Sequence, residues 1–457
     1  MSENTKGFKV GILNLLIFVI ISSTAFSAES EEQIQLPDFE KKTLLNGFEF
    51  MFLENPGGKA PFLLMIKNGA AFDPVEKWGV TQLMARMMIA GLEEELTKQS
   101  MKAAEIEINV NVDWDAIYFY GTSPPEGLVQ ALSLLADIVV RPVFDEYLFT
   151  ETRNTLLEEI RLRSERLEIR TQELFRAKVL EGSPYAHPVQ GTVSTLSNLQ
   201  LRDVKIQFRR LLMPNQAKLA LYFSGDREEL FKRLSRRWGS WVKGEAAPFT
   251  FRGASDRNQS LVVLVDQPAE QEGIVRWGAL AVSKDSRDYH ALKVLEQYLT
   301  LSLPEWAQQI SSTNQIRGSA TLMAKKMPGY LQVSLRSPGN ELVAYCRKLE
   351  QTIKLIRQGE IDLERFEEAK SLALREFRNS LREPFHQLYQ LLGTDLCDLG
   401  LNYIPTYGLR LKRVTPTVLQ GVIETYFENG RSVTVAAGSA SQLGPDLEEI
   451  GTVEVLN

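Results

Sequence analysis

The chain has 457 residues, of which 44% are hydrophobic and 24% charged, and its formal charge at pH 7 is −6. This length allows two or three domains with buried cores. The acidic balance argues against a basic surface for nucleic acid. The two cysteines, Cys346 and Cys397, lie in apolar helical contexts without metal-ligand spacing. We favour buried free thiols, and a disulfide is the alternative in an oxidising compartment.

The first 27 residues have the features of a secretory signal peptide. Lys6 and Lys9 precede an apolar stretch over residues 10–21, and the Ala-Phe-Ser triplet at residues 25–27 satisfies the small-x-small cleavage rule. We therefore expect cleavage before Ala28. The apolar stretch is shorter than the roughly 20 residues that a membrane-spanning helix needs. We expect an exported protein with no stable membrane span after cleavage, periplasmic if the cell is Gram-negative.

Residues 79–88 predict an amphipathic helix. Their apolar side chains follow the i, i+3, i+4, i+7 spacing that buries one side of a helix. The members of this stripe are Val80, Leu83, Met84, Met87 and Met88. Gln82 and Arg86 lie one turn apart on another face of the same helix.

Further short patterns precede and follow this helix. They are Asn-Gly-Ala-Ala-Phe-Asp at residues 68–73, Pro-Val-Phe at 142–144, Leu-Leu-Glu-Glu-Ile at 156–160, Tyr-Ala-His-Pro at 185–188, Met-Pro-Asn at 213–215 and Gly-Asp at 225–226. Each pattern is weak by itself, but their order and spacing make a chance match improbable. Together with the helix they resemble the insulinase/pitrilysin family of zinc peptidases, over nearly the whole chain after the signal peptide.

The resemblance implies a degenerate metal site. In this family an inverted His-x-x-Glu-His motif on the helix binds zinc and activates water, and the three places here hold Gln82, Ala85 and Arg86. The family's distal Glu ligand corresponds to Glu159, 73 residues after Arg86. Arginine has no lone pair for a metal, alanine offers no general base, and an amide is a poor ligand beside imidazole. We therefore expect neither a catalytic residue nor a metal ligand set on this chain.

A carboxylate that has lost its cation needs another positive partner, because an unpaired buried charge is costly. We predict that the Arg86 guanidinium stands where the family's zinc stands and pairs with Glu159 or Glu158. The alternative is that Gln82 and Arg86 form a solvated helix face and that Glu159 is an ordinary helix carboxylate.

The family also uses a loop of its second half, in which an Arg and a Tyr bind substrate. By position this loop is expected over residues 299–318, and its two functional places fall on Gln309 and Ile316. The second half of the machinery is therefore also expected to be degenerate. A displaced cation, Arg317, is the alternative for this position.

The three histidines do not supply a replacement site. His187, His290 and His386 are far apart in the sequence, whereas zinc takes three or four His, Cys or carboxylate ligands. His187 and His386 each lie within two residues of a proline, and a neighbouring aromatic residue favours packing over catalysis.

The two halves of the chain resemble each other at an offset near 214 residues. Residues 217–225 match residues 431–438, as terminal strands that end at glycine. Strand segments, such as residues 62–66, 117–120, 261–265 and 331–335, alternate with helical segments that include charged helices over residues 145–180 and 363–381. We predict an α+β fold of two homologous domains, each a mostly antiparallel sheet covered by helices, as the resemblance also implies.

The predicted segments are a signal peptide over residues 1–27, an N-terminal peptidase-like domain over 36–241, a linker over 242–260 and a C-terminal peptidase-like domain over 261–457.

For function, the resemblance implies a non-catalytic subunit that pairs with a separate zinc-bearing peptidase chain of the family and helps to hold short or unfolded peptides. We expect no cofactor on this chain and zinc on the partner alone. Peptides would be captured by strand addition to a sheet edge, which needs no metal. The alternatives are a stand-alone peptide-binding or scaffold protein of the envelope, including a homodimer, and an active hydrolase with an atypical site.

Overall fold

The computed structural model describes residues 34, 36–55, 57–93, 95–267, 272–310, 317–428 and 431–456. The predicted signal peptide over residues 1–27 and the site position Ile316 lie outside these residues. The segment Ile34–Asn457 forms one compact unit. Within the described ranges, no helix is both long and apolar enough to cross a membrane.

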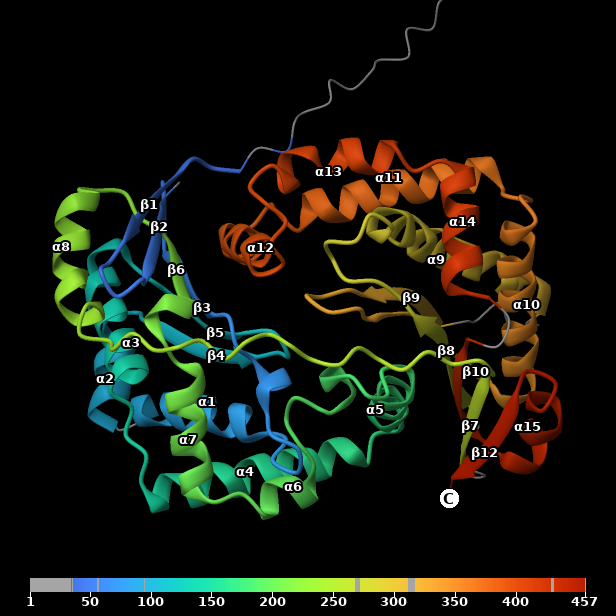
Figure 1. The fold of residues 1–457 in the computed structure, drawn as a ribbon, viewed down its shortest axis with the longest axis horizontal. Coiled ribbons are helices and arrows are strands. Elements are labelled where there is room, and N and C mark those ends of the chain that lie inside the picture. Colours follow the sequence, from blue (N-terminus) through green and yellow to red (C-terminus); the bar gives the residue numbers. More distant parts are fainter. Residues whose placement is uncertain are drawn as a thin grey trace, which may run out of the picture. The chain divides into compact units, whose positions relative to one another are not determined.

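The first half of the chain builds a six-stranded sheet in the order β1-β2-β6-β3-β5-β4 (Figure 1). Its strands are β1 (Phe39–Thr43), β2 (Glu49–Leu53), β3 (Ala60–Ile66), β4 (Glu107–Val112), β5 (Ile117–Ser123) and β6 (Ala217–Tyr222). The β2–β6 pair is parallel and the other pairs are antiparallel.

The second half builds a sheet in the order β12-β7-β11-β8-β10-β9. Its strands are β7 (Leu261–Asp266), β8 (Glu272–Leu280), β9 (Arg317–Met323), β10 (Tyr330–Pro338), β11 (Val433–Gly438) and β12 (Thr452–Leu456). Five strands repeat the order and the directions of the first sheet. The sixth differs, because β1 pairs antiparallel with β2 whereas β12 pairs parallel with β7. The predicted α+β class with two mostly antiparallel sheets is confirmed, while the domain and linker boundaries stay a prediction.

The helices of the first half are α1 (Val80–Ala90), α2 (Glu95–Ala103), α3 (Leu128–Val140), α4 (Glu146–Ser164), α5 (Leu167–Val179), α6 (Val193–Ser197), α7 (Leu201–Leu211) and α8 (Arg227–Trp238). Apart from α5, they lie on one side of the first sheet. The expected continuous helix over residues 145–180 is wrong, because α4 ends at Ser164 and the chain turns before α5 begins. The turn is required because α5 leaves α4 to pack against the second sheet.

The helices of the second half are α9 (Tyr289–Ile310), α10 (Gly339–Arg357), α11 (Leu363–Asn379), α12 (Pro384–Leu396), α13 (Tyr403–Lys412), α14 (Pro416–Tyr426) and α15 (Ala440–Leu447). The expected loop over residues 299–318 is wrong for its first part, because α9 continues to Ile310. Leu299, Leu303 and Trp306 are buried, and their spacing of four and three residues is that of a helix face in a core.

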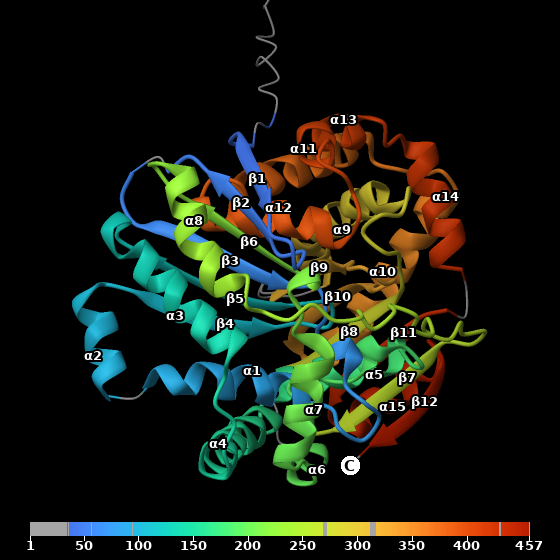
Figure 2. The same ribbon diagram turned by 60° about the vertical axis from the view of Figure 1, so that its left-hand side comes forward.

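One helix of each half packs against the sheet of the other half. The helix α12 packs against β3 and β6 of the first sheet, and α5 packs against β8 and β11 of the second (Figures 1 and 2). Successive side chains of a strand point to opposite faces, so both faces of these apolar strands need a cover. In the first sheet, Leu63 and Met65 meet Leu388 and Leu392 of α12 on the face opposite to the main core.

Candidate functional site

The helix α1, which carries Gln82 and Arg86, is held at its N-terminus by a buried carboxylate. Asp73 accepts hydrogen bonds from the Gly79 N–H at 2.7 Å and the Thr81 N–H at 3.2 Å, and Gln207 Nε2 donates to it at 3.3 Å. Burial raises the pKa of Asp73 to about 7. Gly79 has φ 93°, and a Cβ there would stand 2.5 Å from the Gln190 carbonyl oxygen, so the position needs glycine.

Arg86 and Glu159 form a bidentate ion pair. Arg86 Nη1 donates to Glu159 Oε1 at 3.0 Å and Nη2 donates to Oε2 at 2.8 Å. The side chains are 36% and 37% exposed, so the pair is only partly shielded from water. The predicted pairing of Arg86 is confirmed with Glu159. Glu158 lies near Arg161 instead, with 3.8 Å between Glu158 Oε2 and Arg161 Nη1. A guanidinium and a carboxylate joined by two N–H···O hydrogen bonds form one of the strong ion-pair geometries in proteins.

The remaining two positions leave this site without metal-binding chemistry. The Ala85 side chain is fully buried in the core, and Gln82 is 7% exposed and lines the same cavity as Arg86. Among the residues that the structure describes, no group of three or more His, Cys, Asp and Glu side chains could hold a metal ion. A permanently charged guanidinium on the remaining carboxylate does not fit zinc.

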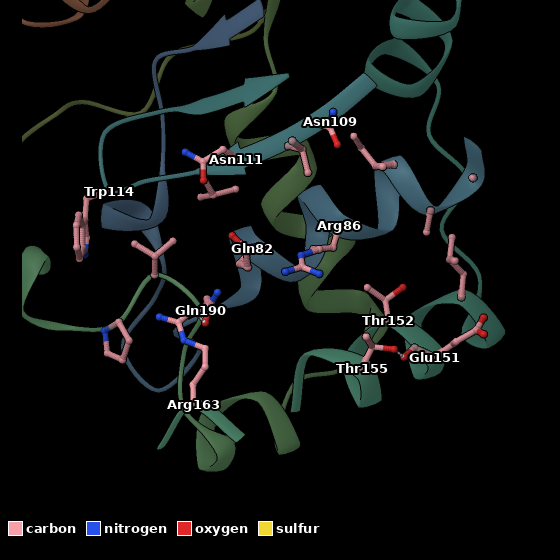
Figure 3. A pocket seen from close by; sticks show the side chains of 18 of the residues that line it. Gln82, Arg86, Asn109, Asn111, Trp114, Glu151, Thr152, Thr155, Arg163 and Gln190 are labelled. Atoms are coloured by element: carbon pink, nitrogen blue, oxygen red, sulfur yellow. Dashed lines mark hydrogen bonds between the residues drawn. The ribbon is translucent and has the colours of Figure 1, made fainter. Parts of the chain in front are cut away.

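Gln82 and Arg86 face a cavity of about 1180 Å³ (Figure 3). Its walls are α1, the strand β4, the helices α4 and α5 and the segment that follows His187. Asn109 and Asn111 of β4 line it, as do Thr152 and Thr155 of α4. In the described part of the chain, β4 pairs with β5 alone, so its other edge borders the cavity with backbone groups free to bind an added strand.

The lining residues of β4 were not singled out from the sequence. The signal that could have found them is the alternation over residues 106–112, in which Ile106, Ile108 and Val112 are buried and Asn109 and Asn111 are exposed. Such alternation indicates a strand with one face buried and the other exposed to solvent.

The second-half positions do not join this cavity. Gln309 lies in the last turn of α9, and its Nε2 donates to Glu305 Oε1 at 2.9 Å. Arg317 begins β9 and is exposed. Neither lines the cavity with Arg86. A substrate-binding role at Gln309 therefore has no geometric support.

The histidines and cysteines pack inside the protein or lie at its surface. The buried His187 ring stacks on Trp78 at 5.2 Å, and burial lowers its pKa to about 4. His290 is buried beside Tyr403 and Tyr407, and its pKa is also lowered to about 4 by burial. His386 is exposed on α12.

Cys346 and Cys397 are both buried and free, as predicted. Burial raises the pKa of the Cys346 thiol to about 12 and that of Cys397 to about 11. Both therefore stay as neutral thiols at physiological pH, which disfavours reaction or metal binding.

Comparison with known proteins supports the resemblance to the insulinase family. The family model of insulinase (peptidase family M16) matches residues 52–193. A Helicobacter pylori protein named non-peptidase homolog YmxG is 21% identical over 372 residues, which are 78% of this chain and 82% of that protein. A Rickettsia bellii protein named uncharacterized zinc protease is 22% identical over 218 residues. That match spans 47% of this chain and about half, 53%, of the relative.

Solved structures share the fold. A protease from Helicobacter pylori has a TM-score of 0.79 at 17% identity, over 88% of this chain and all of that one. A peptidase M16 inactive domain from Pseudomonas fluorescens has a TM-score of 0.76 at 14% identity, over 88% and 98% of the two chains. The periplasmic protease PqqL from Escherichia coli has a TM-score of 0.73 at 15% identity, over 92% of this chain and 49% of that one.

The two duplicated sheets with their helices thus define a peptidase-like α+β fold. Over residues 52–193 the chain resembles the insulinase family, peptidase family M16. Two of the proteins that it resembles are named a non-peptidase homolog and an inactive domain.

Proposed function

We propose that this chain is a non-catalytic, peptide-binding subunit that pairs with a separate zinc-bearing chain of its family. The observation that carries the proposal is the Arg86–Glu159 ion pair in the cavity wall. Peptide hydrolysis by a zinc enzyme needs a metal that activates water and polarises the carbonyl group. A guanidinium can balance the charge of Glu159, but it cannot supply a bound hydroxide.

The cavity supports peptide binding without hydrolysis. Its volume of about 1180 Å³ exceeds the roughly 300–1,000 Å³ that small-molecule pockets occupy, which suits an extended segment of several residues. The edge of β4 offers backbone donors and acceptors along one wall. Binding by strand addition uses these groups and leaves side-chain selectivity to the cavity.

Two comparisons support the pairing with a second chain: the length of the Escherichia coli protease and the name of the Helicobacter pylori relative. This chain spans about half of the periplasmic protease from Escherichia coli, so a second chain of similar size would complete a molecule of that length. The Helicobacter pylori relative is named a non-peptidase homolog. The zinc is then expected on the partner, this chain needs no cofactor, and export through the predicted signal peptide would bring it to the periplasm of a Gram-negative cell.

One experiment distinguishes peptide binding from peptide hydrolysis. The purified protein is incubated with a mixed peptide library, with and without a chelator, and both bound and cleaved peptides are identified by mass spectrometry. We expect bound peptides and no cleavage. Cleavage that the chelator abolishes would overturn the non-catalytic assignment.

A matched pair of variants tests the binding wall. Asn111→Lys places a charged side chain on the exposed edge of β4, which discourages strand pairing, and should weaken peptide binding about tenfold. Gln130→Lys adds the same charge at an exposed position on α3 outside the cavity lining and should bind as the parent does. Equal binding by the parent and both variants would contradict capture at β4.

A further inference from the structure

One end of the cavity carries a buried guanidinium group with two donor atoms that lack an acceptor among the described residues. Arg176 of α5 lines the cavity and is 9% exposed. Its Nε and Nη2 atoms make no hydrogen bond to any residue that the structure describes. The guanidinium carbon lies 5.2 Å from the centre of the Trp114 ring, and Trp114 also lines the cavity.

A second guanidinium lines the same end. Arg163, near the end of α4, donates from Nη1 to Gln190 Oε1 at 2.5 Å. The acceptor of this hydrogen bond is a neutral amide and not a carboxylate. Figure 3 shows Arg163 beside Gln190, on the same side of the cavity as Trp114. We call Arg163, Arg176, Trp114 and Gln190 the cationic pocket.

The protein does not neutralise this charge. A guanidinium taken out of water is costly unless an anion or good acceptors replace the water, and a cation–π contact returns only about 0.5–2 kcal/mol. Burial correspondingly lowers the pKa of Arg176 from its usual range. Glu173, one turn earlier on α5, lines the cavity and is a partial counter-charge, but it makes no ion pair with Arg176 within 4 Å. Two guanidinium groups thus face one carboxylate.

We propose that the cationic pocket binds a carboxylate group of a peptide held along β4. This inference rests on the proposed function and names the group that is bound as a peptide carboxylate, either an acidic side chain or the C-terminus. Planar guanidinium groups match carboxylates through paired N–H donors, and an apolar ring beside them lowers the local dielectric constant, which strengthens the attraction.

The direction of the bound strand determines which carboxylate reaches the pocket. Trp114 follows the end of β4 at Val112 by two residues. A peptide strand antiparallel to β4 would begin near Trp114, so an Asp or Glu side chain near its N-terminus would enter the pocket. A parallel strand would end there and would supply its C-terminal carboxylate. Both sources present the same chemical group.

The experiment compares three versions of one peptide that the protein binds. The first has a Glu near its N-terminus and a free C-terminus, the second carries Gln in place of that Glu, and the third has a C-terminal amide. Dissociation constants are measured by calorimetry with the whole protein at two salt concentrations. We expect at least tenfold weaker binding for either the Gln or the amide peptide, and the affected peptide identifies the source of the carboxylate.

Protein variants assign the effect to the pocket. Arg176→Met keeps an unbranched side chain beside Trp114 and should remove the preference for the acidic peptide. The variant should also be as stable as the parent or more stable, because it removes a buried charge without acceptors. Glu173→Gln should tighten binding of the acidic peptide severalfold. Arg236→Met, at an exposed position of α8, is the control for net charge and should keep the preference.

The outcomes separate this inference from the function on which it rests. If the parent binds all three peptides equally, the carboxylate site is wrong while peptide binding stands. A preference that persists in folded Arg176→Met and Arg163→Gln proteins would also overturn the site. If no library peptide binds at all, the proposed function itself fails.

Discussion

A guanidinium and a zinc ion both attract a carboxylate, but only the ion accepts lone pairs from imidazole and water. At the residue scale this difference separates a zinc site from an ion pair. Arg86 meets Glu159 through two hydrogen bonds and thereby keeps a charge balance that a metal would otherwise provide. Because both side chains are more than a third exposed, the pair contributes little to stability, roughly 1 kcal/mol or less.

If the helix keeps the geometry of a metal site, three substitutions should restore one. The triple variant Gln82→His, Ala85→Glu, Arg86→His places two imidazole groups one turn apart on α1 beside Glu159. We expect it to bind one zinc ion per chain with micromolar or tighter affinity, measured by calorimetry and elemental analysis.

The matched control for zinc binding is Gln82→Ala, Arg86→Ala, which frees Glu159 but adds no imidazole and should bind no zinc. A correctly folded triple variant that takes up no zinc would show that Glu159 does not stand at a metal-ligand position.

The two buried histidines predict a loss of stability in mild acid. The pKa values of His187 and His290 are lowered to about 4 by burial, whereas an exposed histidine titrates near about 6.5. Between these pH values the unfolded chain binds protons that the folded chain does not, so the free energy of unfolding falls as the pH falls from about 6.5 to 4. The raised pKa of Asp73 acts in the opposite direction, so the test compares variants.

His290→Phe keeps an aromatic ring and removes the proton site, and its Nε2 has no partner among the described residues to lose. Denaturant unfolding at several pH values should show a shallower pH slope for this variant, by about one proton at pH 5. His386→Phe, at an exposed position, is the control. Identical slopes for the parent and His290→Phe would contradict the prediction.

At the scale of elements, the site depends on how α1 and β4 are placed. The amphipathic stripe of residues 79–88 predicts α1 correctly, because its period reports a single buried face. The pairing of Arg86 with Glu159 was also predictable, because an unpaired partly buried carboxylate attracts the nearest cation. The length of α9 was missed, since position within a family carries no information about where a local helix ends.

The N-terminal cap of α1 should control the stability of the cavity wall. Asp73→Ala removes acceptors from the Gly79 and Thr81 N–H groups and should lower the free energy of unfolding by about 2 kcal/mol. Thermal or denaturant unfolding near neutral pH measures this loss. Asp137→Ala breaks an exposed ion pair with Arg237 and should cost less than about 1 kcal/mol. Equal losses for the two variants would show that Asp73 does not hold the helix.

At the scale of the whole molecule, the exchange of α5 and α12 joins the two halves. The sequence repeat predicts two similar sheets, but it does not say which helix covers which sheet. That assignment depends on contacts between residues more than 100 positions apart, such as the hydrogen bond from Gln172 Nε2 to Gln332 Oε1 at 2.9 Å. Arg276 of β8 likewise donates to Thr171 and Gln172 of α5. Local patterns do not encode such partners, so the fold class was predictable and the exchange was not.

The exchange predicts that neither half folds well alone. A cut between Asn258 and Gln259, both exposed, separates the sheets and leaves each without its second helical cover. Each half expressed alone should bind a hydrophobic dye and lack a cooperative thermal transition, whereas the two halves expressed together should reassemble. A half that is monomeric and unfolds cooperatively by itself would contradict this account.

The measurement that tests the central proposal most directly is native mass spectrometry, with metal analysis, of the tagged protein recovered gently from its own cell envelope. The account predicts a complex with a second chain of similar mass and one zinc ion for each copy of that second chain. Recovery as a zinc-free monomer or homodimer would contradict the pairing and favour a stand-alone binding protein. Zinc on this chain alone would contradict the assignment of Gln82, Ala85 and Arg86 as a degenerate metal site.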